Sequence, residues 1–107
     1  MKRLIIQISK FSTTLDSLIA NNKLSKEDFW KFEDQLANHP DTGDVIQGTG
    51  GLRKTRLKSS SKGKSGGFRV CYCDVPEKEK LFLVAIFGSY ISKERPRKSV
   101  YGREKIS

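Results

Sequence analysis

Apolar residues in the N-terminal half follow first a strand-like and then a helical spacing. Residues 4–8 (LIIQI) form a short apolar run with one polar position, which predicts a covered β-strand. In the next segment, STTLDSLIANN, the residues Leu15, Leu18 and Ile19 fall at positions i, i+3 and i+4, the spacing of one helix face. The asparagine pair that follows is a suitable terminator, so we predict that the helix ends there.

A second helix is predicted over SKEDFWKFEDQLANHP, which begins at Ser25. Ser25 is a good N-cap, and the two acidic residues close behind it favour the positive end of a helix. Phe29, Phe32 and Leu36 form one apolar stripe, which is more typical of a core contact than of a ligand site. Pro40 ends the helix, because the residue before a proline avoids the α conformation.

The C-terminal half contains three strand-like segments, at residues 52–58 (LRKTRLK), 68–75 (FRVCYCDV) and 80–88 (KLFLVAIFG). The last is apolar at nearly every position, as expected of a strand buried on both faces. The polar SSSKGKSGG and the short PEKE join the three as consecutive hairpins. We therefore predict an α+β fold of order β-α-α-β-β-β, with an antiparallel sheet and both N-terminal helices packed on one face.

The glycine-rich stretch DTGDVIQGTGG separates the helical half from these strands. It lacks the glycine spacing of a dinucleotide- or phosphate-binding loop, and no helix is predicted after it. We expect a folded connecting loop with one small apolar anchor, Val45–Ile46.

Alternation along the first two hairpin strands sorts their side chains onto two faces. The residues expected to point toward the helices are Thr55, Leu57, Phe68 and Val70. The cations expected to meet on the open face are Lys54, Arg56 and Arg69. The hairpin therefore combines an apolar face with a basic one.

Charge is distributed unevenly along the chain, whose formal net charge is +9. Residues 1–50 carry six Lys or Arg and seven Asp or Glu, whereas residues 51–107 carry fifteen and five. The segment Gly51–Val70 contains no acidic residue at all. Such an asymmetry points to an anionic partner, either a nucleic acid, an acidic protein or, less favourably, a membrane face. RNA fits best, because a polyanion relieves the repulsion between cations and releases its own counterions on binding.

Several functional classes are not supported by the residue types. His39 is the one histidine and lies far from the basic segment, so acid–base catalysis by His and Glu has no support. Cys71 and Cys73 are expected to be reduced thiols, because a disulfide between them would be strained and a metal site needs about four ligands. We expect no metal and no cofactor. No apolar run approaches the about 18 residues of a membrane span, and the N-terminal apolar run is too short for a secretory signal, so we expect a cytoplasmic protein.

RNA cleavage is still chemically possible without a metal. The 2′-hydroxyl of the substrate can act as the nucleophile, and guanidinium groups can stabilise the negative charge that develops on the phosphorus. A lysine surrounded by cations has a lowered pKa and can then act as a base or an acid. The substrate would have to be held in line, which a large partner could do.

Three motifs carry a resemblance to a known family. The stretches GDVIQGTGGLRKTR (43–56), KGKSGGFRVCYC (62–73) and LFLVAIFG (81–88) resemble the RelE/HigB group of toxins from type II toxin–antitoxin systems. The resemblance covers roughly residues 25–88 and includes the predicted order of elements. It implies an mRNA interferase that cleaves mRNA on the ribosome and is neutralised by a cognate antitoxin, and it implies that the complex of the two represses its own operon.

The chain departs from that family after its last strand. Relatives continue with an aromatic residue, a small residue, Lys, a polar residue and Glu, and then form a helix. Here Phe87 and Gly88 are followed by Ser89, Tyr90 and Ile91, so the Lys and Glu are absent. Tyr90, Lys93 or Arg95 are the candidate substitutes.

The combined prediction is a toxin domain at residues 1–92 followed by a basic tail at 93–107. The predicted catalytic residues are Lys54, Arg56, Arg69, Tyr72 and Tyr90. The predicted RNA-binding residues are Arg53, Lys58, Lys62, Lys64, Lys93 and Arg95. The predicted partners are an antitoxin with a helix-turn-helix (HigA-like), the ribosome with its mRNA, and operator DNA only through the antitoxin complex. Two alternatives stay open: a catalytically degenerate member of this fold that only binds RNA or protein, and a gyrase inhibitor like the related ParE toxins.

Overall fold

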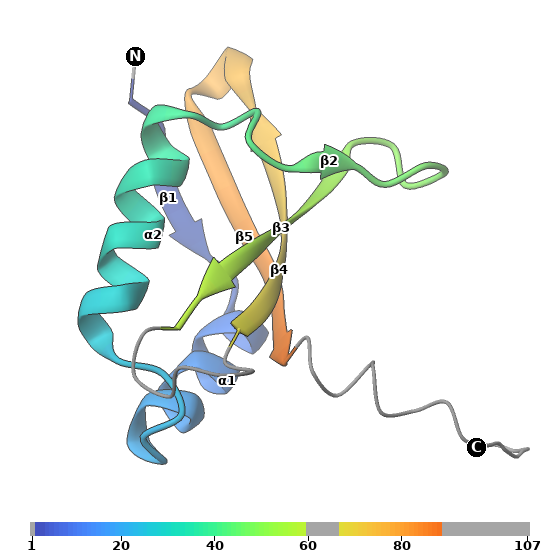
Figure 1. The fold of residues 1–107 in the computed structure, drawn as a ribbon. Helices are drawn as coiled ribbons and strands as arrows, with labels where there is room; N and C mark the ends of the chain where they lie inside the picture. The colour runs from blue at the N-terminus through green and yellow to red at the C-terminus, as the bar shows by residue number, and fades with distance from the viewer. Residues whose placement is uncertain (1, 60–66, 89–107) are drawn as a thin grey trace, which may run out of the picture.

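The computed structural model describes residues 2–59 and 67–88. Within them the elements follow in the order β1 (Leu4–Gln7), α1 (Ser9–Ala20), α2 (Lys26–Asn38), β2 (Asp44–Val45), β3 (Leu52–Lys58), β4 (Gly67–Val75), a 3-10 turn η1 (Pro76–Lys78) and β5 (Lys80–Gly88). The strands form one sheet of order β1-β5-β4-β3-β2 (Figure 1). The predicted α+β class and the order of its elements are confirmed, with β2 as an addition.

The sheet is mixed, so the prediction of a wholly antiparallel sheet is wrong. The hairpins β3–β4 and β4–β5 are antiparallel as predicted, whereas β1 pairs in parallel with β5, with Ile5 opposite Leu81. Hairpins fix the direction of consecutive strands only. Because two helices follow β1, no hairpin sets its direction, and a long crossover of this kind permits parallel pairing.

Strand β2 lies within the glycine-rich stretch that was expected to be a loop. Asp44 and Val45 pair with Lys54 and Arg53 of β3 in antiparallel register. The Ile46 amide donates to the Leu52 carbonyl over 2.8 Å and closes the turn between the two strands. Gly48, with a φ of +79°, takes a left-handed conformation in that turn, which glycine adopts without steric cost. A strand of two residues is too short to leave an alternating pattern, which explains why the sequence did not reveal it.

The sequence explains where α2 begins, but not where α1 begins. The Ser25 side chain accepts a hydrogen bond of 3.1 Å from the Asp28 amide, so the predicted N-cap of α2 is confirmed. Helix α1 begins at Ser9, earlier than the STTLDSLIANN pattern indicated. Its early start brings Phe11 onto the face of Leu15, and both side chains are buried. No helix in the described part of the chain is long and apolar enough to cross a membrane.

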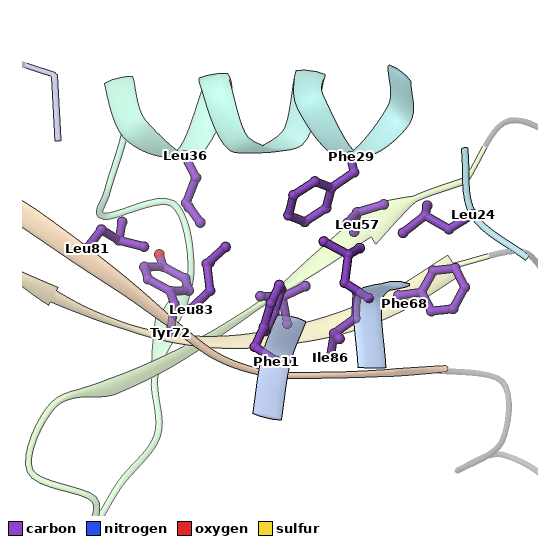
Figure 2. Packing of buried hydrophobic residues seen from close by; sticks show 12 residues of the cluster. Phe11, Leu24, Phe29, Leu36, Leu57, Phe68, Tyr72, Leu81, Leu83 and Ile86 are labelled. Carbon is purple, nitrogen blue, oxygen red and sulfur yellow. The ribbon is translucent and has the colours of Figure 1, made fainter. Parts of the chain in front are cut away.

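The core lies between the two helices and one face of the sheet (Figure 2). Phe11 of α1 and Phe29 of α2 meet with their ring centroids 6.1 Å apart, which places both helices on the same side. The sheet residues that complete this cluster are Leu57, Phe68, Val70, Tyr72, Leu81, Leu83 and Ile86. Each buried side chain of this size stabilises the fold by about 1.5–3 kcal/mol relative to exposure.

Strand β5 is fully buried on its helix-facing side only, contrary to the expectation of burial on both faces. Leu81, Leu83 and Ile86 are buried, whereas Phe82 is half-buried and Phe87 is 46% exposed. The spacing from Leu83 to Ile86 is odd because the register shifts there: Tyr72 pairs with Leu83, and Cys71 with Ala85. This bulge returns Ile86 to the core face.

The Tyr72 hydroxyl joins the end of α2 and the start of β2 to the sheet. It donates a hydrogen bond of 2.8 Å to the Pro40 carbonyl and accepts one of 2.8 Å from the Gly43 amide. Burial raises the pKa of Tyr72, so the hydroxyl keeps the proton that it donates. The Arg53 guanidinium donates to the Gly43 carbonyl over 2.6 Å. Both backbone groups of Gly43 are therefore held by side chains.

Only glycine fits at position 43. A Cβ there would lie 2.6 Å from the Lys54 carbonyl oxygen and 2.9 Å from the Tyr72 hydroxyl oxygen. The chain directly before β2 can therefore approach β3 and Tyr72 this closely only because residue 43 has no side chain. This close approach fixes the chain directly before Asp44.

We expect Tyr72→Phe to destabilise the protein by about 1–3 kcal/mol, because the Gly43 amide and the Pro40 carbonyl lose their partner while the ring still fills the core. For a domain of this size each kcal/mol lowers Tm by about 4–8 °C. Thermal unfolding followed by circular dichroism measures the loss. Amide exchange at Gly43 should accelerate more than exchange at Leu83, and an unchanged Tm would contradict the role of this hydroxyl.

We expect Glu33→Gln to stabilise the protein at pH 7 more than at pH 4. Burial raises the pKa of Glu33, and a hydrogen bond from Gln7 offsets only part of that effect. The folded chain therefore binds the proton more tightly than the unfolded chain, and stability falls as the pH rises from the ordinary Glu value through the raised one. Tm measured at both pH values tests this, with Asp16→Asn on the exposed face of α1 as the control for lost charge. A Tm gain that is equal at both pH values would refute the assignment.

Candidate nucleic-acid interface

Three cations meet on the face of the sheet that the helices leave open. Arg56 of β3 lies directly opposite Arg69 of β4, and Lys54 lies opposite Cys71 in the same register. Since Leu57, Phe68 and Val70 occupy the alternate positions and are buried in the core, these cations point away from the helices. This is the arrangement that strand alternation predicted.

The three cations border one cleft of about 450 Å³. Its lining residues are Thr42, Gly43, Asp44, Lys54, Thr55, Arg56 and Arg69. The cleft lies where β2, β3 and β4 run side by side. Its charged lining residues all stand on these strands, and Thr42 and Gly43 line it from the loop before β2. A volume in this range suits a small ligand or a nucleotide-sized part of a larger one.

Within residues 2–59 and 67–88, no ion pair neutralises the cations of this cleft. Arg56 and Arg69 are directly opposed, and like charges at such positions are destabilising. Neither of them forms an ion pair within 4.0 Å among the residues that the structure describes. The Nε atom of Arg69 is buried and has no hydrogen-bond partner there, which costs free energy unless a ligand supplies an acceptor.

These groups are suited to a phosphate. Guanidinium groups present donors in a fork that matches two phosphate oxygens, and the Lys54 ammonium adds a mobile positive charge. In a cleft partly shielded from water, the same groups can stabilise the additional negative charge of a pentacoordinate phosphorus. The arrangement can therefore bind a phosphodiester and stabilise its transition state.

Arg53 and Tyr72 lie on the other face of the sheet from these cations. They pair with each other in the register, and Tyr72 is fully buried. Both side chains hold Gly43 through hydrogen bonds. The sequence analysis predicted a catalytic role for Tyr72 and an RNA contact for Arg53. In the strands, however, Arg53 has the parity of Leu57, and Tyr72 has the parity of Phe68, which is the core side. The structure does not bring them together with Lys54, Arg56 and Arg69.

Lys58 lies further along β3, beside a second cleft of about 530 Å³. That cleft separates α2 from the edge of β3, and its lining residues are Asp28, Lys31, Phe32, Gln35, Arg56, Lys58 and Ser59. Strand β2 pairs only with Arg53 and Lys54, so in the described part of the chain the rest of this β3 edge has no neighbouring strand. Arg56 borders both clefts and connects them.

Five of the predicted site residues and the predicted domain boundary at residues 92 and 93 lie outside the described residues. These site residues are Lys62, Lys64, Tyr90, Lys93 and Arg95. Their assignments stay predictions from the sequence.

Asp44 is a cleft residue that the sequence did not reveal. It lies opposite Lys54 in the β2–β3 pairing and lines the cleft with the three cations. No local pattern indicates it, because it stands outside the acid-free segment and in a stretch expected to be a loop.

No metal-binding group of three or more His, Cys, Asp or Glu side chains occurs within residues 2–59 and 67–88. Cys71 and Cys73 are free thiols and half-buried. No described residues are therefore arranged to hold a metal, and the cleft's own donors are cations suited to an anionic ligand.

No protein-family model matches the chain. Among solved structures, the chain is similar to the E. coli toxin RelE in the free state, a mutant with two arginines replaced by alanine. The TM-score is 0.59 at 18% sequence identity, and the alignment covers 87% of this chain and 90% of that chain. At this identity the likeness establishes the fold alone: two helices and a five-stranded mixed sheet in the arrangement of RelE.

Proposed function

We propose that this chain is the toxin of a type II toxin–antitoxin module and that it cleaves mRNA held on the ribosome. The observation that supports the proposal most directly is the cleft in which Lys54, Arg56 and Arg69 meet with no ion-pair partner among the described residues. The RelE-like fold and the sequence motifs that resemble RelE/HigB toxins point in the same direction.

The proposed reaction needs no metal and no cofactor. The 2′-hydroxyl attacks the adjacent phosphorus, and the two arginines stabilise the charge that develops on its oxygens. The ribosome would hold the substrate in line, which explains how a small cleft with few acid–base groups can suffice. Lys58 and the loop lysines Lys62 and Lys64 would bind neighbouring phosphates.

The proposal includes three partners and places the toxin in the cytoplasm. An antitoxin with a helix-turn-helix would neutralise the toxin by covering its basic face. Acidic groups on the antitoxin would accelerate the association. The ribosome with mRNA would be the substrate. Operator DNA would be bound only through the antitoxin complex.

A binding-only function is the second candidate. Directly after Phe87 and Gly88 the sequence continues Ser-Tyr-Ile in place of the Lys and Glu motif of the family it resembles. The residues that line the described cleft include no histidine. Such a protein would bind RNA or an antitoxin without cutting.

Gyrase inhibition would show instead as DNA damage without new mRNA ends.

We expect expression of the chain from a tightly controlled promoter to arrest growth, and Arg69→Ala to relieve the arrest. Loss of one group that stabilises developing charge lowers the rate by about 10²–10³-fold. Primer extension on cellular mRNA should show new 5′ ends with the wild type, and at least 100-fold fewer with Arg69→Ala.

The matched control is Lys78→Ala, which removes one exposed positive charge from η1 at the other end of β4. It should arrest growth like the wild type. Growth arrest without new mRNA ends would contradict cleavage, and a harmless wild type would contradict the toxin assignment altogether.

We expect binding of a single-stranded RNA oligonucleotide to weaken with salt, and Arg56→Ala to reduce that dependence. Each neutralised phosphate contributes about 0.7 to the slope of log K against log salt concentration for single strands. Fluorescence anisotropy between about 50 and 300 mM salt, over which the Debye length falls about 2.5-fold, measures the slope. An identical slope for Arg56→Ala and Lys78→Ala would show that the cleft does not contact phosphate.

A further inference from the structure

Asp44 is the one carboxylate among the residues that line the cleft. The register places it directly opposite Lys54, and side chains at directly opposed positions project from the same face of a sheet. Arg56 lies two residues further along β3 on that face, with Arg69 beyond it on β4. The carboxylate therefore projects from the same face as all three cations.

The backbone on both sides of Asp44 is fixed. The amide and the carbonyl of Gly43 are bonded to Tyr72 and Arg53 over 2.8 Å and 2.6 Å, and Val45 pairs with Arg53 on β3. This is an unusual degree of anchoring for a residue within a glycine-rich connection. A functional group held this way keeps its geometry when a substrate binds.

The Asp44 carboxylate is not used by the fold. Within residues 2–59 and 67–88 it accepts no hydrogen bond and forms no ion pair within 4.0 Å, even with Lys54 opposite. An anionic side chain in a cleft that binds an anion weakens that binding by repulsion. Simple phosphate binding would be better served without it, so its position calls for a chemical role.

We propose that Asp44 is the general base of the cleavage reaction, a role that rests on the proposed function. Its carboxylate takes the proton of the 2′-hydroxyl while the 2′-oxygen forms a bond to phosphorus. The bond from phosphorus to the 5′-oxygen breaks, and that oxygen takes a proton from the Lys54 ammonium. Arg56 and Arg69 hold the charge of the phosphorane, and the products are a 2′,3′-cyclic phosphate and a 5′-hydroxyl.

This assignment separates the two proton transfers between neighbouring strands. The carboxylate that accepts the first proton stands on β2, and the ammonium that donates the second stands opposite it on β3. The cleft then needs no histidine, which fits the position of His39 outside its lining.

The test is single-turnover cleavage of an mRNA on programmed ribosomes with an empty A site, with binding measured separately by pelleting the complex. Asp44→Asn should lower the cleavage rate at saturation by about 100-fold or more, while binding stays within about twofold or becomes tighter because a repulsive charge is lost. Asp44→Glu keeps a carboxylate and should retain at least a tenth of the rate. The matched control is Asp41→Asn, an exposed carboxylate of the same connection that does not line the cleft, and it should cleave like the wild type.

A substrate with sulfur in place of the 5′-bridging oxygen separates the base from the acid. The thiolate leaves without a proton, so this substrate should restore cleavage by Lys54→Ala and not by Asp44→Asn. Thermal unfolding of each variant shows whether it is folded. Wild-type rates for Asp44→Asn, or a loss of binding and of Tm together, would overturn the role of Asp44 and leave the proposed function standing. A wild type that does not cleave would overturn both.

Discussion

Successive side chains of a β-strand point to opposite faces of the sheet, and this constraint couples the core of the protein to its cleft. In β3 and β4 the residues of one parity include Leu57, Phe68 and Val70, which are buried under the helices. The other parity then has to face outward, and it carries Lys54, Arg56 and Arg69. A slip of one residue in the pairing would bury charge and expose the core together, so the burial of the apolar face holds the cations in register.

The same constraint explains why crowded cations are tolerated. The repulsion between Arg56 and Arg69 acts on strands whose other face is held by the core, so it cannot separate them without exposing Val70 and Phe68. The burial of apolar side chains on the other face of the same two strands therefore offsets the repulsion between the crowded cations. The buried Nε of Arg69 adds to that cost in the free protein, and an anion would remove both penalties at once.

The parts of this structure that could be predicted from the sequence are those with a repeated pattern. The stripe Phe29, Phe32 and Leu36 marked α2, and the alternation of β3 and β4 placed the cations correctly. Three features had no such pattern: a strand of two residues at Asp44–Val45, the bulge that shifts Ile86 back into the core, and the parallel direction of β1. Each depends on contacts between distant segments, which local spacing does not encode.

Tyr72 shows how two kinds of sequence argument can disagree. The family resemblance favoured a catalytic hydroxyl, whereas alternation placed the side chain with Phe68 and Val70 on the core face. In the structure its hydroxyl bonds to Pro40 and Gly43, so it holds the backbone that precedes Asp44 and does not line the cleft. If RNA and an antitoxin both bind by relieving the repulsion between Arg56 and Arg69, each excludes the other from the same cleft. Neutralisation would then follow from the charge that enables binding, without any change in the fold.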